Sequence, residues 1–395
     1  MTGERQIDLL DGGLYAGDPS PTYAWLRDQP APYHDAENEL WAIARYRDLV
    51  AIEKDPVRYS NRNAFRPMPV DAHDDRSMIS LDDPDHQNHR RLVARRFTPK
   101  AVGGHEERIR SIVVELIDTA AAAVEFDVVE ALAAPLPAMM IAEYLGFGID
   151  RWRDIKSWSE RTIPLGGGVR YQNEDGILAA FEFAVACSEL IAERRREPRA
   201  DMVSHWCQAT VDGRPMTDEE IISECLLAVD GGAETTRTVI AQTVWDLLEH
   251  PDQYALLRAD PGLLRTTAIE EFIRWVTPIL NMARVVTEDH ELLGRDLRTG
   301  DRVLLMYSSA NRDPEFFDDP ERYDLRRRHN HHVAFGFGTH FCLGASLARL
   351  EIRVMFEELL TRIPELAFVD GRPPRRIPGA FVRGVESVPV RVVGR

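Results

Sequence analysis

The chain has 395 residues, of which 44% are apolar, and a formal net charge of −17 at pH 7. The apolar content suffices for a large core, whereas the negative charge disfavours nucleic acid and anionic membranes, which attract Lys and Arg. The N-terminus, MTGERQIDLLDGG, lacks a basic segment followed by an apolar one, and no uncharged apolar run reaches about 18 residues. We therefore expect a protein without a membrane anchor, and four unevenly spaced cysteines fit a reducing cytoplasm.

Helical periodicity dominates the chain from about residue 84 to 275, and short alternating segments occur near both ends. The alternating segments predict strands at 41–46, 302–307 and 388–393. No Ser- or Pro-rich linker and no repeat of fixed period interrupts the pattern. The sequence predicts a mainly α fold with small β-sheets, in a single domain over residues 1–395.

An early helix is predicted after the Asp-Pro of DDPDHQNHRRLV, and it places His86 and Arg90 four residues apart on one face. Positive charge gathers in two clusters in this otherwise acidic chain. The clusters are Arg90, Arg91, Arg95, Arg96 and Lys100, and Arg326, Arg327 and Arg328. They are either solvated faces or sites for anionic groups and for an acidic protein partner.

The segment 219–249 is long enough to cross the whole protein as one helix, roughly 45 Å. Its centre is weak, because Gly231 and Gly232 each cost about 1 kcal/mol in a helix interior. Thr235 follows three and four residues later, on the same face. That face can hold a small ligand, with the hydroxyl of Thr235 and the carboxyl of Glu234 as a relay for protons.

Two charged patterns follow along the chain. Glu271 and Arg274 are spaced to pair on a helix, although an isolated exposed pair would contribute little stability. The cluster HNHH at 329–332 has no accompanying carboxylate or cysteine spacing, so a loop is favoured over a zinc site.

The run AFGFGTHFCLGASLARLE carries Cys342 at the predicted start of a helix over 344–361. A thiolate is the form that binds metal, and a helix N-terminus lowers the pKa of a thiol. Gly338 and Gly344 let the backbone turn and approach a flat ligand closely, and Phe335 can lie against it. A dinucleotide loop is excluded, because position 341 is Phe where a third Gly is required.

The pattern FGxGxHxCxG resembles the signature of the cytochrome P-450 family of haem-thiolate monooxygenases at every defining position. The resemblance covers most of the chain and implies that family's triangular, mostly α fold, with haem b ligated by Cys342. GGAETT resembles the family's acid-alcohol motif, with Glu234 as the acid and Thr235 as the alcohol. Glu271 and Arg274 resemble its ExxR motif, and Arg327 matches the third member of that buried structural triad.

The resemblance also implies the remaining site residues. The expected haem-binding set is Cys342, His86, Arg90, Arg284, His340, Phe335, Gly338, Gly344, Gly231 and Gly232, with His86, Arg90, Arg284 and His340 at the propionates. The expected substrate pocket is Phe65, Val70, Met78, Ile79, Leu226, Val229, Ala233, Ile279, Leu280, Met282, Phe381 and Val382, with the segments 65–70 and 163–169.

These segments are apolar and turn few fixed charges inward, which favours a lipophilic substrate. The expected reaction inserts one atom of O2 into a C–H bond, and a thiolate ligand favours cleavage of the O–O bond. No flavin- or iron–sulfur-binding segment is present, so a ferredoxin and an NAD(P)H-dependent ferredoxin reductase are the expected electron donors. The sequence looks most like actinobacterial members that oxidise steroid side chains. Open alternatives are a terpenoid or polyketide oxidation, a peroxygenase, and a non-catalytic haem carrier or gas sensor.

Overall fold

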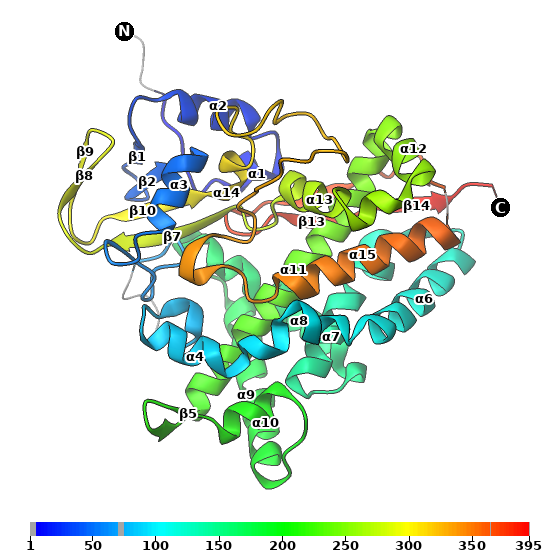
Figure 1. Ribbon diagram of the computed structural model, residues 1–395, viewed down its shortest axis with the longest axis horizontal. Coiled ribbons are helices and arrows are strands. Elements are labelled where there is room, and N and C mark those ends of the chain that lie inside the picture. Colours follow the sequence, from blue (N-terminus) through cyan, green and yellow to red (C-terminus); the bar gives the residue numbers. More distant parts are fainter. Residues whose placement is uncertain (1–4, 70–74, 364, 395) are drawn as a thin grey trace.

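The computed structural model describes residues 5–69, 75–363 and 365–394. Figure 1 shows the larger sheet on one side of the molecule and the long helices filling the rest. The helices are α1 (Gly12–Ala16), α2 (Ser20–Asp28), α3 (Tyr46–Glu53), α4 (Asp85–Val93), α5 (Pro99–Gly103), α6 (Glu106–Ala122), α7 (Pro135–Leu145), α8 (Trp152–Thr162), α9 (Glu174–Arg196), α10 (Met202–Gln208), α11 (Asp218–Glu249), α12 (Pro251–Ala259), α13 (Ala268–Val276), α14 (Tyr307–Ala310) and α15 (Ala345–Arg362). The mainly α class with small sheets is confirmed.

The strands form one five-stranded sheet and several smaller ones. They are β1 (Tyr33–Asp35), β2 (Leu40–Ile43), β3 (Tyr59–Ser60), β4 (Glu125–Asp127), β5 (Thr210–Val211), β6 (Arg214–Pro215), β7 (Asn281–Val286), β8 (His290–Leu292), β9 (Arg295–Leu297), β10 (Arg302–Met306), β11 (Leu366–Phe368), β12 (Arg375–Ile377), β13 (Gly384–Ser387) and β14 (Pro389–Val392). The large sheet has the order β1-β2-β10-β7-β3, with β10 parallel to β2, and a second sheet has the order β11-β14-β4. Segments from both halves of the chain therefore share each of these two sheets.

Two of the three predicted strands are confirmed, and the third is shorter than predicted. Strands β10 and β14 fall within 302–307 and 388–393. The predicted strand at 41–46 ends at Ile43, and α3 begins at Tyr46. A carboxylate oxygen of Asp313 accepts the backbone N–H of Tyr46 at 2.8 Å, which stabilises the start of a helix there. Local alternation could not reveal this distant cap.

Helix α11 runs through the centre of the helical part, and its bounds agree with the predicted 219–249. A capping box between Thr217 and Glu220 defines its start. Its second half packs against α13 and α15 through fully buried apolar side chains, among them Ile240, Phe272 and Phe356. Burial of each such side chain contributes about 1.5–3 kcal/mol. This packing fixes α11 and the N-terminus of α15 on opposite sides of one cavity.

Candidate active site

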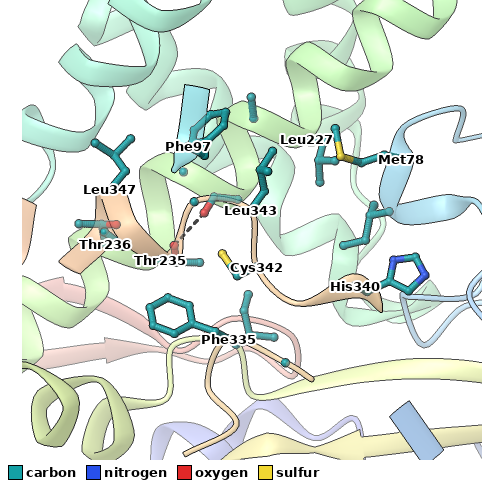
Figure 2. A pocket seen from close by; sticks show the side chains of 18 of the residues that line it. Met78, Phe97, Leu227, Thr235, Thr236, Phe335, His340, Cys342, Leu343 and Leu347 are labelled. Carbon is teal, nitrogen blue, oxygen red and sulfur yellow. Dashed lines mark hydrogen bonds between the residues drawn. The ribbon is translucent and has the colours of Figure 1, made fainter. Parts of the chain in front are cut away.

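A cavity lies between α11 and the loop that carries Cys342. Figure 2 shows Cys342 and Thr235 directed at the same space, with His340 toward one end and Phe335 below. Its walls also include residues of α4 and β7. The structure thus brings together one thiol, one hydroxyl-bearing helix and a set of cationic side chains from segments far apart in sequence.

The loop before α15 is held in place by its own backbone and by neighbouring elements. The N–H of Cys342 donates to the carbonyl of Phe335 at 2.9 Å, and the Arg349 guanidinium lies 4.5 Å from the centre of the Phe335 ring. Gly338 has φ +69°, and a Cβ there would overlap the carbonyl oxygen of Glu53 in α3. Among the described residues, the lining of this cavity includes Phe335 and Gly344 but not Gly338, so Gly338 serves the loop's contact with α3.

The thiol of Cys342 lies in a mixed environment. Burial raises its pKa, while the N–H groups of Gly344 and Ala345 and the charges of Arg90 and Arg349 oppose that rise. The helix N-terminus thus lowers the pKa of this thiol as expected, but desolvation outweighs that contribution. The same N–H groups and cations favour the thiolate once a metal cation displaces the proton.

On the α11 side, Gly231 and Gly232 differ in their surroundings. A Cβ at Gly231 would meet open space, whereas a Cβ at Gly232 would overlap the side chain of Ile141 in α7. The Thr235 hydroxyl donates to the carbonyl of Gly231 at 2.8 Å and faces the cavity. Gly231 therefore gives room above the thiol, and Gly232 permits close packing of α11 on α7.

Glu234 does not line the cavity that Thr235 faces. It lies outside the cavity lining among the described residues, and Arg237 Nη1 donates to both of its carboxylate oxygens at 2.8 and 2.9 Å. Arg237 also contacts Glu160 at 2.9 Å, and Lys156 bridges Glu160 to exposed Glu130. Burial raises the pKa of Glu234, against the effect of Arg237. Glu234 is thus the inner end of a charged network that extends to the surface.

Four cationic or imidazole side chains gather at one end of the cavity, namely His86, Arg90, Arg284 and His340. The rings of His86 and His340 lie 4.1 Å apart, and Arg90 donates to the carbonyl of Phe341 at 2.6 Å. Burial, together with the charges of Arg284, His86 and Arg90, lowers the pKa of His340 to about 2. Neutral imidazole N–H groups and two guanidinium groups form a set of donors suited to carboxylates.

The predicted triad of Glu271, Arg274 and Arg327 forms behind the loop. Arg274 donates two hydrogen bonds of 2.8 Å to Glu271, and the side chains of both residues are fully buried. Arg327 Nε donates a third hydrogen bond to Glu271, at 3.1 Å. Arg274 also donates to the carbonyls of Asn311 and Pro320, which lie before the loop. The triad therefore ties α13 to the segment that leads into the Cys342 loop.

Only part of the predicted substrate pocket lines the cavity. Met78, Ile79, Ile279 and Met282 do. Leu226, Val229 and Ala233 pack into or against the core that α11 forms with α7 to α10. They occupy a different face of α11 from Leu227, Ala228, Gly231 and Thr235, which line the cavity. The structure therefore places the first three outside the described cavity lining, and the sequence does not show which helix face turns inward.

The other predicted pocket residues lie elsewhere. The rings of Phe65 and Phe381 contact each other, and Phe381 also packs against Gly166 in the segment 163–169. Leu280 belongs to the core cluster near the N-terminus, and Val382 pairs with Ile279 through the backbone. The described lining of the cavity does not include Phe65, Leu280, Phe381, Val382 or the segment 163–169. Val70 lies outside the described residues.

Carboxyl side chains that the sequence analysis did not single out also line the cavity. Three carboxyl side chains line the cavity, Glu53, Glu224 and Glu351. Burial raises the pKa of all three, to about 7 for Glu53 and to about 8 for Glu351. A carboxyl among apolar residues of a helix, as in VAIEK and SECLL, is the sequence signal that could have identified the first two.

Comparisons with known proteins agree with this geometry. The family model Cytochrome P-450 matches residues 263–379. The steroid C26-monooxygenase of Mycobacterium tuberculosis is 39% identical over 99% of this chain and 98% of its own length. The linalool 8-monooxygenase of Pseudomonas putida is 33% identical over 98% of each chain. The crystal structure of CYP109E1 from Bacillus megaterium in complex with testosterone superposes with a TM-score of 0.89, at 31% identity over 97% of this chain and 100% of that one.

The chain belongs to the cytochrome P-450 family. It is a monooxygenase whose cofactor is haem b. The residues present fit that group: a thiol faces the cavity centre, apolar side chains form the walls, and donors for two propionates gather at one end. No helix within the described residues is long and apolar enough to cross a membrane.

Proposed function

We propose that this monooxygenase hydroxylates the side chain of a steroid or of another lipid of similar length. The observation that carries the proposal is one cavity that holds Cys342 on one wall and Gly231 and Thr235 on the other, with apolar side chains between them. Burial of an apolar substrate against Met78, Leu227 and similar residues supplies binding free energy. The relative named as a steroid C26-monooxygenase supports the substrate class.

The roles of the polar residues follow from their chemistry. When bound, haem supplies the activation of O2. Cys342 would hold its iron through Sγ, and His86, Arg90, Arg284 and His340 would bind its propionates. Thr235 would hold a proton at Oγ1, on the cavity wall that faces Cys342, and pass it on. Glu234 would resupply that proton from the network of Arg237 and Glu160, which reaches solvent.

Electrons would come from a ferredoxin and its NAD(P)H-dependent reductase. The first basic cluster splits in the structure, because Arg90 turns to the cavity while Arg91, Arg95 and Lys100 stay exposed. The exposed members offer a docking face for an acidic carrier. In the second cluster, Arg327 belongs to the structural triad, because its Nε donates to Glu271.

The substrate class is tested by titrating the ferric protein with steroids, long-chain lipids and terpenoids. A fitting ligand displaces water from the distal side and shifts the optical spectrum from low to high spin. We expect the shift with steroids or long lipids at micromolar concentration, and product with a ferredoxin system. A terpenoid substrate is the second candidate, supported by the linalool 8-monooxygenase relative. A shift with short terpenoids alone would favour it and contradict the steroid assignment.

Thr235→Ala is expected to lower the product formed per O2 consumed by at least about tenfold, because a positioned proton donor contributes about 10²–10⁴-fold. Oxygen uptake should continue, with hydrogen peroxide as the product. The measurement is parallel quantification of O2, peroxide and hydroxylated product. Thr243→Ala is the matched control, since Thr243 lies on the same helix but is fully buried away from the cavity. Unchanged coupling in Thr235→Ala would refute the relay.

A further inference from the structure

Glu53, the last residue of α3, lies at the cationic end of the cavity and has one unpartnered oxygen. Its side chain is 1% exposed. Oε1 accepts from Arg284 Nη2 at 3.1 Å and from the Tyr307 hydroxyl at 2.8 Å. Oε2 is buried and accepts no hydrogen bond of regular geometry among the described residues. A buried carboxyl oxygen without a partner costs free energy, so it requires an explanation.

The charges around Glu53 come from several elements. Arg284 of β7 contacts it directly, and His86 and Arg90 of α4 and His340 of the loop line the same end of the cavity. Lys54 lies 5.2 Å from the centre of the Phe337 ring. Burial raises the pKa of Glu53 to about 7, and the charge of Arg284, the Tyr307 hydroxyl and the N–H of Phe337 oppose that rise. The protonated form of this carboxyl is therefore accessible near neutral pH.

Bound haem brings two propionate groups to this end. An ionised Glu53 would then compete with a propionate for the single guanidinium of Arg284, and like charges at close range disfavour ionisation. A protonated Glu53 becomes a donor instead, because the carboxylic acid O–H can bond a carboxylate. Oε2 is the oxygen free to carry that proton, since Oε1 already accepts two bonds.

We propose that Glu53 is a further haem-binding residue, which in its protonated form donates a hydrogen bond from Oε2 to one haem propionate. Oε1 keeps Arg284 and Tyr307 in position at the same time. The protonated carboxyl of Glu53 is neutral, so the propionate is the one negative charge of this pair. This role rests on haem as the cofactor and is independent of the substrate.

The proposal fixes the sign of a pH effect. Haem would bind the protonated form of Glu53 more tightly, so binding raises the pKa of Glu53 above its haem-free value. Haem retention should be full below that value and fall as the pH rises from about 7 toward the pKa of the haem-bound protein. Loss of a hydrogen bond to a charged group corresponds to a change in affinity of roughly tenfold or more.

The test measures the rate of haem transfer from the holoprotein to excess apomyoglobin between about pH 6 and about pH 9. In the wild type, the rate should rise about tenfold across this range. Glu53→Gln keeps an N–H donor that does not titrate, so its rate should stay nearly constant and close to the wild-type value at low pH. Glu53→Ala should lose haem about tenfold faster at low pH.

Asp246→Asn provides the matched control. Asp246 is a buried carboxyl of α11 with an unpartnered oxygen and a pKa raised by burial to about 6, but it lies outside the described cavity lining. Its variant should keep the wild-type pH profile. A wild-type rate that does not change with pH, or an unchanged pH profile in Glu53→Gln, would overturn the proposal. If Glu53→Ala does not fold, the comparison of wild type with Glu53→Gln still decides.

Discussion

Cys342→Ser is expected to abolish monooxygenase activity, by at least about 10³-fold, because enzymes commonly accelerate reactions by about 10⁶-fold or more and the axial ligand is central to this one. A serine hydroxyl is a harder and far less acidic ligand than a thiol, so it binds haem iron weakly. The reduced, carbon-monoxide-treated variant should lack the red-shifted Soret band that thiolate ligation produces. Haem content should fall as well, although the propionate-binding donors remain.

Cys187→Ser is the control for this experiment. Cys187 is a free, fully buried cysteine of α9 that lies outside the described cavity lining. Its substitution replaces a thiol by a hydroxyl, as Cys342→Ser does. Its variant should keep the red-shifted band and the activity. Retention of that band in Cys342→Ser would contradict the assignment of Cys342 as the iron ligand.

Arg274→Ala is expected to lower the free energy of unfolding by about 3–5 kcal/mol, because removal of one member of a buried ion pair leaves the charge of the other buried and only partly compensated. Glu271 would remain fully buried, with Arg327 and Asn330 as its remaining side-chain partners. The carbonyls of Asn311 and Pro320 would lose their donor. Since proteins are stable by only about 5–15 kcal/mol, haem retention should suffer too.

Urea unfolding monitored by circular dichroism measures this loss, and Arg58→Ala is the control. Arg58 pairs with Asp55 and Glu288 at the surface, with its side chain 48% exposed. Exposed pairs contribute about 0–1 kcal/mol, so this variant should unfold near the wild-type midpoint. A loss below about 1 kcal/mol in Arg274→Ala would show that the triad does not stabilise the fold.

Four of the buried carboxyls differ in their partners. Glu271 is compensated by two guanidinium groups, whereas Glu53, Glu224 and Glu351 line the cavity with a raised pKa. Among these four, Glu53 is the one that combines an unpartnered oxygen with the cationic end of the cavity. This difference separates a carboxylate that stabilises the protein from a carboxyl that is free to bind a ligand.

The amino-acid sequence by itself determined the features that depend on neighbouring residues. The bounds of the helices at 219–249 and 344–361 follow from local periodicity, and the motif around Cys342 lies within ten residues. The pairing of Glu271 with Arg274 follows from helical spacing. Such features are encoded in short stretches, because helix geometry and motif spacing repeat independently of the rest of the chain.

Only the tertiary structure decided the features that depend on distant packing. It selected the face of α11 that carries Leu227 and Thr235 over the face with Val229, and it placed Glu234 on Arg237. It also brought Glu53 against Arg284, 231 residues away. Which face is buried, and which buried polar atom finds a partner, depends on all the elements that pack around it, and no local pattern contains that information.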